Sequence, residues 1–305
     1  MEDFKVHVLG CGSARPTMRH YASSQVVEIR GKMFLVDCGE GTQMLLMRAR
    51  INFNKIKGVF VSHLHGDHCF GLIGLISSFG LLGRKAPLLV CAPAQFEGLF
   101  NEMMKMFCGG LDYEVMFRPL DATRQQLVYD DRTLSVVTLP LEHRVPCCGF
   151  LFREKPTLPH IRRDMIDFYG IPVSQINNIK QGADWVTADG EVVPNSLLVT
   201  PADAPRSFAY CSDTRYISTL HQQIEGVSLL YHESTYEKTY ATLAGLYYHS
   251  TAAEAATVAR DAQARQLMIG HYSSRYNDEQ PLLDEAKSIF PNTILAQEGL
   301  VVDIL

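Results

Sequence analysis

The sequence His-Leu-His-Gly-Asp-His at residues 63–68 constrains this chain more than any other segment, because it places three imidazoles and a carboxylate within six residues. His63 and His65 alternate, so on an extended backbone both rings point to one side and can bind one ion. Gly66, which follows His65, lets the backbone turn, so that Asp67 and His68 can face a second ion. Imidazole and carboxylate groups suit zinc and its neighbours. Because only eleven of the 305 residues are histidine, a His-rich polar loop is a poor alternative, and the segment predicts a metal site.

The flanking residues predict where this cluster lies in the fold. Residues 58–62 are apolar and β-branched, which is typical of a short buried strand. Residues 70–82 are apolar with small side chains, which favours a helix packed on a sheet. Ligands of open α/β sheets bind beyond the carboxyl ends of the strands. The cluster therefore follows a strand at the edge where a site is expected.

Three further predicted strands each lead to a histidine or an aspartate. These strands span residues 134–140, 208–211 and 267–270. The residues that follow them are His143, Asp213 and His271. A lone histidine after a strand is usually a hydrogen-bonded loop residue, but with the cluster the set comprises five histidines and two aspartates, enough for two ions. A carboxylate such as Asp213 can bridge metals about 3.5–4 Å apart, so we expect these strand ends to converge on a two-metal site.

This ligand pattern resembles the metallo-β-lactamase superfamily, and further motifs resemble, more narrowly, the short form of the ribonuclease Z (tRNase Z) family. The motifs are Gly-Cys-Gly-Ser at 10–13, Phe-Leu-Val-Asp-Cys-Gly-Glu-Gly-Thr-Gln at 34–43, Tyr-Cys-Ser-Asp-Thr at 210–214, His-Glu-Ser-Thr at 232–235 and His-Ser-Thr at 249–251. The resemblance runs from residue 4 to the C-terminus. It implies an α/β fold, the four-layer αβ/βα sandwich of the metallo-β-lactamase type. We expect one domain over residues 1–305 with a substrate-binding arm inserted at about residues 153–205.

The resemblance also implies roles for individual residues. One zinc ion would be held by His63, His65 and His143. A second zinc ion would be held by Asp67, His68 and His271, with Asp213 bridging the pair. Asp67 would also accept a proton from the attacking water, and Glu233 and His249 would assist near the scissile phosphate. The implied activity is endonucleolytic removal of the 3′ trailer from precursor tRNA, which leaves a 3′-hydroxyl on the tRNA.

Positive charge gathers near the start of the expected arm, although the whole chain has a net charge of −5. The basic residues proposed to contact tRNA phosphates are Arg153, Lys155, Arg162 and Arg163. Prolines interrupt this stretch, and it separates two metal-bearing strands without a strong core pattern, so an excursion from the body is the better interpretation. A solvated surface loop with incidental charge is the alternative.

Other features bear on location and assembly. No hydrophobic run reaches the length of a membrane span, and the first residues do not resemble a signal peptide. The eight cysteines contain no Cys-x-x-Cys pair, so we expect buried free thiols and a cytoplasmic protein. A homodimer is an expectation from the family resemblance alone.

Two segments depart from the family pattern. Residues 16–21 read Pro-Thr-Met-Arg-His-Tyr where the family usually has Pro-Ser/Thr-Lys-x-Arg-Asn, so the sequence does not predict the cleavage position or the handling of a 3′-terminal CCA. Residues 170–175 read Gly-Ile-Pro-Val-Ser-Gln where the family tends to have Gly-Ile-Pro-x-Gly-Pro, so the tip of the arm should differ. Two alternatives stay open: another dinuclear phosphodiesterase acting on small esters, and a non-catalytic binding module.

Overall fold

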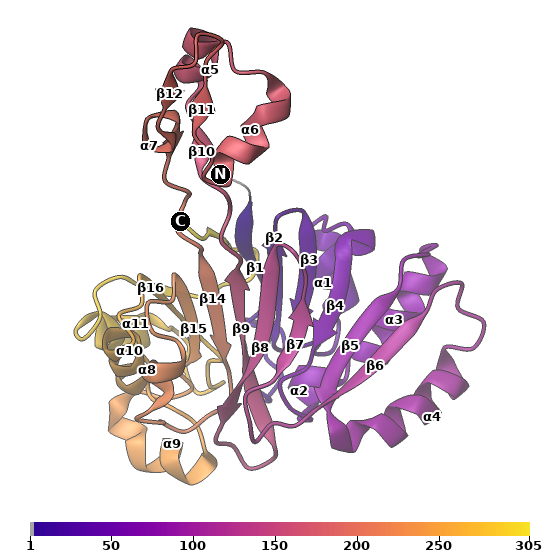
Figure 1. The fold of residues 1–305 in the computed structure, drawn as a ribbon. Coiled ribbons are helices and arrows are strands. Elements are labelled where there is room, and N and C mark those ends of the chain that lie inside the picture. The colour runs from indigo at the N-terminus through magenta and orange to yellow at the C-terminus, as the bar shows by residue number, and fades with distance from the viewer. Residues whose placement is uncertain (1–2) are drawn as a thin grey trace. The chain divides into compact units, whose positions relative to one another are not determined.

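The computed structural model describes residues 3–305, which divide into two compact units. The larger unit comprises the described residues up to Arg153 together with Arg206–Leu305, and the smaller unit comprises Glu154–Pro205. Figure 1 labels the helices and strands of both. Each unit is described in turn.

The first part of the larger unit, together with β18 near the C-terminus, forms a mixed seven-stranded sheet with the order β18-β1-β2-β3-β4-β5-β6. Its strands are β1 (Phe4–Gly10), β2 (Ser24–Ile29), β3 (Lys32–Val36), β4 (Ile56–Phe60), β5 (Leu88–Pro93), β6 (Val115–Leu120) and β18 (Val301–Asp303). Strands β1, β2 and β3 pair antiparallel, and β3 to β6 pair parallel. Arg30 and Gly31 both have positive φ, as a two-residue type I′ hairpin between β2 and β3 requires.

A second seven-stranded sheet has the order β17-β16-β15-β14-β9-β8-β7. Its strands are β7 (Leu127–Asp130), β8 (Leu134–Leu141), β9 (Cys147–Glu154), β14 (Ser207–Cys211), β15 (Leu229–Glu233), β16 (Gln266–Gly270) and β17 (Thr293–Leu295). Strands β14 to β17 run parallel, while β9 pairs antiparallel with β14. Because parallel strands share one direction, the ends of β14 and β16 reach the same edge.

The two sheets pack face to face through buried aromatic side chains. The rings of Phe60 and Phe150 lie 5.3 Å apart, and those of Phe34 and Phe152 lie 5.9 Å apart. All four are completely buried and belong to one continuous apolar cluster. Aromatic pairs at these distances contribute about 0.5–1.5 kcal/mol beyond their buried area. The core between the sheets therefore holds the strand ends in a fixed relation.

Helices cover the outer face of each sheet and complete four layers (Figure 1). Helices packed with the outward side chains of the first sheet are α1 (Thr42–Arg48), α3 (Leu72–Leu81) and α4 (Glu97–Phe107). Those beside the second sheet include α8 (Leu220–Gln223), α10 (Ala252–Asp261) and α11 (Gln280–Lys287). Helix α10 begins with a capping box, in which Thr251 and Glu254 satisfy each other's backbone N–H groups. The predicted four-layer α/β sandwich is confirmed.

Short elements complete the larger unit. They are α2 (Gly66–Cys69), α9 (Ala241–Tyr247) and the 3₁₀ turns η1 (Phe53–Lys55), η2 (Ala94–Phe96) and η3 (Lys238–Tyr240). All eight cysteines are free and buried, as predicted. Within residues 3–305, no helix combines the length and apolar character needed to cross a membrane.

The smaller unit has a core of its own. Strand β10 (His160–Ile161) pairs with β13 (Val199–Thr200), and β11 (Trp185–Val186) pairs with β12 (Val192–Val193). The helices are α5 (Arg163–Tyr169), α6 (Val173–Lys180) and α7 (Asn195–Leu198). Ile171, Ile179, Val193 and Leu198 form a small buried apolar cluster between these elements. A local core of this kind explains why the segment is compact although its sequence lacks a strong hydrophobic pattern.

Candidate metal centre

Four strand ends deliver the proposed ligands to one place in the larger unit. His63 lies three residues after β4, and His143, Asp213 and His271 lie one or two residues after β8, β14 and β16. Because β4 belongs to the first sheet and the other three belong to the second, the ligands meet at a common edge of both sheets. Asp213 and His271 have positive φ values of 49° and 60°. Such backbone strain in residues other than glycine is typical of functional sites.

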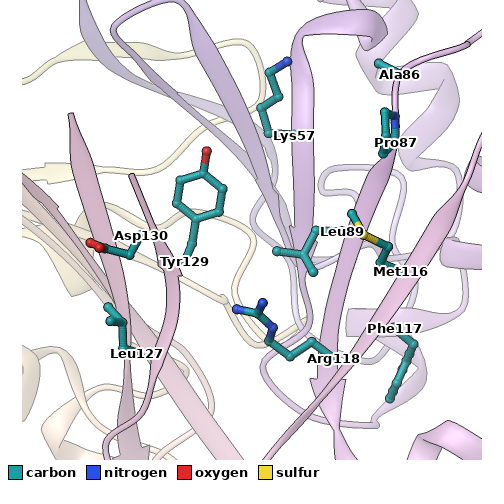
Figure 2. Close-up of a pocket in the computed structure, with 10 residues that line it drawn as sticks. All are labelled: Lys57, Ala86, Pro87, Leu89, Met116, Phe117, Arg118, Leu127, Tyr129 and Asp130. Atoms are coloured by element: carbon teal, nitrogen blue, oxygen red, sulfur yellow. The ribbon is translucent and has the colours of Figure 1, made fainter. Parts of the chain in front are cut away.

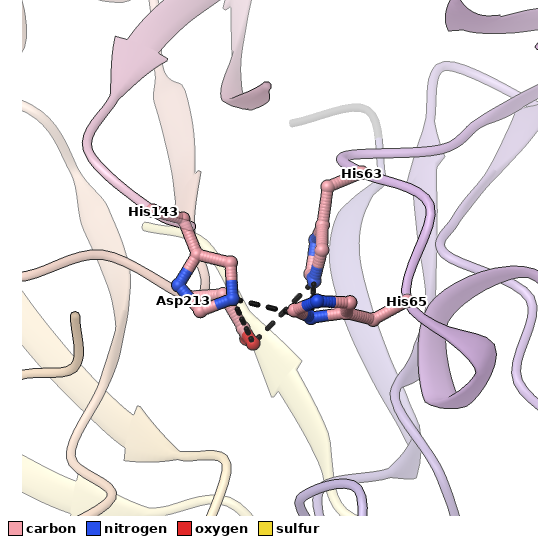
Figure 3. A group of neighbouring side chains, drawn as sticks. All are labelled: His63, His65, His143 and Asp213. Carbon is pink, nitrogen blue, oxygen red and sulfur yellow. Dashed lines mark hydrogen bonds and ion pairs between the residues drawn. The ribbon is translucent and has the colours of Figure 1, made fainter. Parts of the chain in front are cut away.

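His63, His65, His143 and Asp213 form one group (Figure 3). His63 Nε2 lies 3.1 Å from His65 Nδ1, which in turn lies 3.2 Å from His143 Nε2. Asp213 Oδ2 lies 3.5 Å from His63 Nε2 and 3.7 Å from His143 Nε2. One donor atom of each residue thus converges on a single point.

Asp67, His68 and His271 form a second group that also contacts Asp213. Asp67 Oδ2 lies 3.3 Å from His68 Nε2 and 3.5 Å from His271 Nε2. Asp213 Oδ1 lies 3.3 Å from His68 Nε2 and 3.1 Å from His271 Nε2. Since Oδ1 of Asp213 faces this group and Oδ2 faces the other, the Asp213 carboxylate has the orientation of a bridging ligand.

The donor atoms fit metal ions better than they fit each other. Asp67 Oδ2, His68 Nε2 and His271 Nε2 are buried and have no hydrogen-bond partner among the described residues. Leaving a buried polar atom unsatisfied costs about 1–3 kcal/mol, so three in one small volume require a ligand. Imidazole nitrogen and carboxylate oxygen are the donors that zinc prefers. The residues present therefore fit a pair of such ions.

Outer hydrogen bonds orient the rings for this purpose. His68 Nδ1 lies 2.7 Å from Asp37 Oδ2, and His143 Nδ1 lies 3.0 Å from the Tyr248 carbonyl oxygen. His271 Nδ1 similarly lies 3.0 Å from a threonine hydroxyl. An acceptor at Nδ1 keeps the proton on that nitrogen and leaves the Nε2 lone pair for a metal. Burial lowers the pKa of His143 to about 4, so the ring is neutral, as a ligand must be.

Asp37 has a supporting role that the sequence analysis missed. Besides His68, its carboxylate accepts hydrogen bonds from the backbone and hydroxyl of Ser62 at 2.7 and 2.9 Å and from the Tyr210 hydroxyl at 2.7 Å. Asp37 is fully buried and has a φ of 57°. The available signal was a carboxylate directly after the apolar strand Lys32–Val36.

His249 and Glu233 form a pair beside the proposed ligands. His249 Nδ1 lies 2.7 Å from Glu233 Oε1, while the Thr214 amide and the Thr235 hydroxyl hold the Glu233 carboxylate at 2.9 and 2.6 Å. Burial opposes protonation of His249, but the charge and hydrogen bond of Glu233 raise the pKa of His249 to about 9. The His249 ring lies 5.2 Å from His143 and 5.4 Å from His271. The ring is thus held next to both groups, and its raised pKa favours the protonated form.

Five of the seven proposed ligands, together with His249, line a cavity of about 320 Å³. Its walls are Ser13, Ala14, Arg15, His65, Asp67, His143, Arg144, Asp213, Thr235, Tyr236, Tyr247, His249, His271, Ser273 and Ser274. A larger cavity of about 630 Å³ lies between β5, β6 and β7 (Figure 2). Its lining includes Lys57, Arg118 and Asp130 but no histidine or cysteine. We therefore place the site in the smaller cavity, where the unsatisfied donor atoms lie.

The four basic residues proposed for tRNA binding are divided between the two units. Arg153 is on β9 in the larger unit, where its guanidinium donates to the Gln223 carbonyl at 3.4 Å. Lys155, Arg162 and Arg163 belong to the smaller unit. Arg162 is paired with Asp164 at 2.7 Å, a partner that lies just beyond the basic stretch in sequence. Contact of these residues with tRNA stays a prediction.

Solved structures with the same fold include human tRNase Z, short form, with a TM-score of 0.70, 24% identity and coverage of 99% of both chains. Another is the metallo-β-lactamase fold protein YhfI from Bacillus subtilis, with a TM-score of 0.67, 18% identity and coverage of 99% of this chain and 100% of that one. Fold and ligand geometry together define the chain as a metallo-β-lactamase fold protein.

Sequence relatives define the family within that class. The family model described as anti-Pycsar protein Apyc1 matches residues 4–152. Ribonuclease Z of Bacteroides fragilis (strain YCH46) is 53% identical over 304 residues, which cover 100% of both chains. Ribonuclease Z of Porphyromonas gingivalis (strain ATCC BAA-308 / W83) is 45% identical over the same length and coverage. The chain belongs to the ribonuclease Z family.

Proposed function

We propose that this chain is a metal-dependent endoribonuclease that removes the 3′ trailer from precursor tRNA and leaves a 3′-hydroxyl on the tRNA. The observation that carries the proposal is the meeting, in one cavity, of two ligand groups joined by Asp213 with the His249–Glu233 pair. Full-length identity of 53% to a ribonuclease Z supports RNA rather than a small ester as the substrate. An intact ligand set argues against a non-catalytic binding module.

The proposed cofactor is a pair of zinc ions. His63, His65 and His143 would hold one, and Asp67, His68 and His271 would hold the other, with Asp213 shared. Ions bound there would lower the pKa of a water molecule and neutralise charge on the phosphodiester. The choice of zinc rests on the chemistry of the donors, which are five imidazoles and two carboxylates.

The protein's own groups then move the protons. Asp67 lines the cavity and accepts or orients the proton of the attacking water. His249 stands next to both ligand groups with Nδ1 bound to Glu233, so Nε2 is the nitrogen that can donate to the departing 3′-oxygen. Glu233 is completely buried and acts by holding His249 in position and keeping it protonated.

The smaller unit, Glu154–Pro205, is the proposed substrate arm, with Lys155, Arg162 and Arg163 contacting tRNA phosphates. Arg153, on the larger unit, is the fourth proposed contact. A homodimer and a cytoplasmic location are part of the proposal, the latter supported by eight buried free thiols.

The experiment compares a precursor tRNA with a 3′ trailer against bis(p-nitrophenyl) phosphate. We expect wild-type protein to cut the precursor at one position near the trailer junction and to hydrolyse the small diester, and Asp67→Ala to abolish both. Replacing Glu154–Pro205 by a short linker should abolish precursor cleavage while small-diester hydrolysis survives. Hydrolysis of the small diester without any precursor cleavage by the wild type would favour the small-ester phosphodiesterase instead.

A further inference from the structure

Arg144 is a cation at the mouth of the cavity that the proposed mechanism does not use. It follows the proposed ligand His143, is exposed, and lines the same cavity as Asp67 and His249. Its guanidinium carbon lies 4.7 Å from the centre of the Tyr247 ring. Among residues 3–305, no carboxylate lies within ion-pair distance of it. A fixed positive charge without a counter-ion, beside a site for a phosphodiester, calls for an anionic partner.

The position of Arg144 is set from both sides. His143 Nδ1 donates to the Tyr248 carbonyl at 3.0 Å, which joins the segment carrying Arg144 to the segment carrying Tyr247. The Tyr247 ring beneath the guanidinium favours this position, because arginine binds aromatic faces through both charge and shape. The N–H groups at the edge of the guanidinium stay available for two parallel hydrogen bonds to a phosphate.

A neighbouring arginine shows what a merely structural contact looks like here. Arg215 also lies over a tyrosine, with 5.2 Å between its guanidinium carbon and the centre of the Tyr248 ring. Unlike Arg144, it is ion-paired with Glu142, and it lines a different cavity, which His249 also borders. The two arginines share the contact with a tyrosine ring and differ in free charge. Arg215 is therefore a matched control.

We propose that Arg144, held by Tyr247, binds the phosphate on the tRNA side of the scissile bond, the next phosphate in the 5′ direction. This inference rests on the proposed function. The side follows from His249, which is two residues from Tyr247 and serves the departing 3′-oxygen of the tRNA. The wall formed by Tyr247 and Arg144 therefore faces the part of the substrate that keeps this oxygen. Binding there would fix the register of the RNA chain in the cavity.

The test is a double-mutant cycle between the protein and the substrate. Precursor tRNA is made with an uncharged methylphosphonate at the linkage 5′ of the scissile one, at the linkage 3′ of it, or at neither. Wild type, Arg144→Gln and Arg215→Gln are compared by kcat/KM, after the metal content of each is shown to be equal. A charge-assisted hydrogen bond accounts for about a 10- to 100-fold change in kcat/KM.

We expect the methylphosphonate at the 5′ linkage to lower kcat/KM of wild type and of Arg215→Gln by this factor. Arg144→Gln should already have the lowered kcat/KM on the native precursor, and the modified precursor should lower it no further. The inference would be overturned if the losses from Arg144→Gln and from the 5′ methylphosphonate were additive, or if Arg144→Gln were coupled to the 3′ linkage instead. In either case, cleavage of the native precursor by wild type would still support the proposed function. Failure of wild type to cleave the native precursor would overturn both.

Discussion

Two clusters in the larger unit combine histidine with other metal-binding side chains, and they differ in how their polar atoms are paired. Around Asp213, buried donor atoms of Asp67, His68 and His271 have no partner. In the cluster of Cys11, His20 and Glu298, every such atom is satisfied: His20 Nδ1 lies 3.0 Å from Glu298, and Cys11 Sγ donates to the Ala296 carbonyl at 3.4 Å. The second cluster thus contains residue types that can bind zinc, but their polar atoms already bond one another as in a salt bridge.

The difference shows that residue type alone does not identify a metal centre. His20 Nε2 also bonds Glu279 at 3.2 Å, and Glu279 in turn pairs with Arg19 at 2.7 Å, so charges balance within the cluster. Binding a metal there would require breaking these contacts, whereas binding at Asp213 would satisfy atoms that now have no partner. We therefore assign ions to the first cluster and a loop-anchoring role to the second.

The largest expected effect comes from removing the shared ligand. Asp213→Ala should lose at least one of the bound ions and lower phosphodiester hydrolysis by more than about a thousandfold, because Asp213 faces both groups. The matched variant Cys11→Ser should keep both the metal content and the activity. Elemental analysis and small-diester kinetics check both, and loss of an ion from Cys11→Ser would break the comparison.

A second prediction separates catalysis from metal binding within the first cluster. His249→Ala should lower kcat by about 10²- to 10⁴-fold, the usual range for a general acid, with unchanged metal content. The reason is that Nδ1 of His249 bonds Glu233 and the residue is not needed as a ligand. Measured kcat with parallel metal analysis checks this. Loss of metal from this variant would make His249 a ligand and contradict the assignment.

A third prediction concerns the outer contacts that distinguish the first cluster. Asp37→Asn keeps the size of the side chain but removes the carboxylate that orients His68. Metal affinity should fall about 10- to 100-fold, as for other outer-sphere carboxylates. Competition with a chromophoric chelator measures it. Wild-type affinity in this variant would show that the His68 ring is held by packing alone.

The smallest effect is expected at the second cluster and depends on pH. The hydrogen bond that His20 donates to Glu298 raises the pKa of His20 above its usual 6.5, so its stabilising contribution is fully present below that pH and is lost as the pH rises through the raised value. Burial opposes ionisation of Glu298, but His20 lowers its pKa below 4.5, so this contribution disappears only in more acidic solution. Glu298→Gln should therefore lower Tm by about 2–4 °C at pH 6 and by less at pH 9. Calorimetry at both values checks it, and an equal loss at each pH would exclude an ion pair.

The sequence predicted the strand ends well because these follow from local patterns, and the layers followed from the family resemblance. Apolar strands that lead to His143, Asp213 and His271 are visible as short apolar runs in the sequence. The fold class followed from the family resemblance. The structure places the same strand ends side by side, as expected from the sequence.

Long-range pairing could not be predicted in the same way. The bond between Asp37 and Tyr210 joins residues far apart in sequence, and the contact of Arg144 with Tyr247 depends on how the loop after β8 meets the end of α9. The sequence also counted Arg162 as available for tRNA, although Asp164 partly neutralises its charge. Composition shows which chemistry is present, whereas partners are decided only when distant segments pack together.

The most direct test of the central claim is a crystal structure with anomalous scattering measured on both sides of the zinc absorption edge. We expect two peaks per chain, one within reach of His63, His65 and His143 and the other within reach of Asp67, His68 and His271, both beside Asp213. We expect none between Cys11, His20 and Glu298. A single peak at Asp213, or a peak at the second cluster, would contradict the central claim.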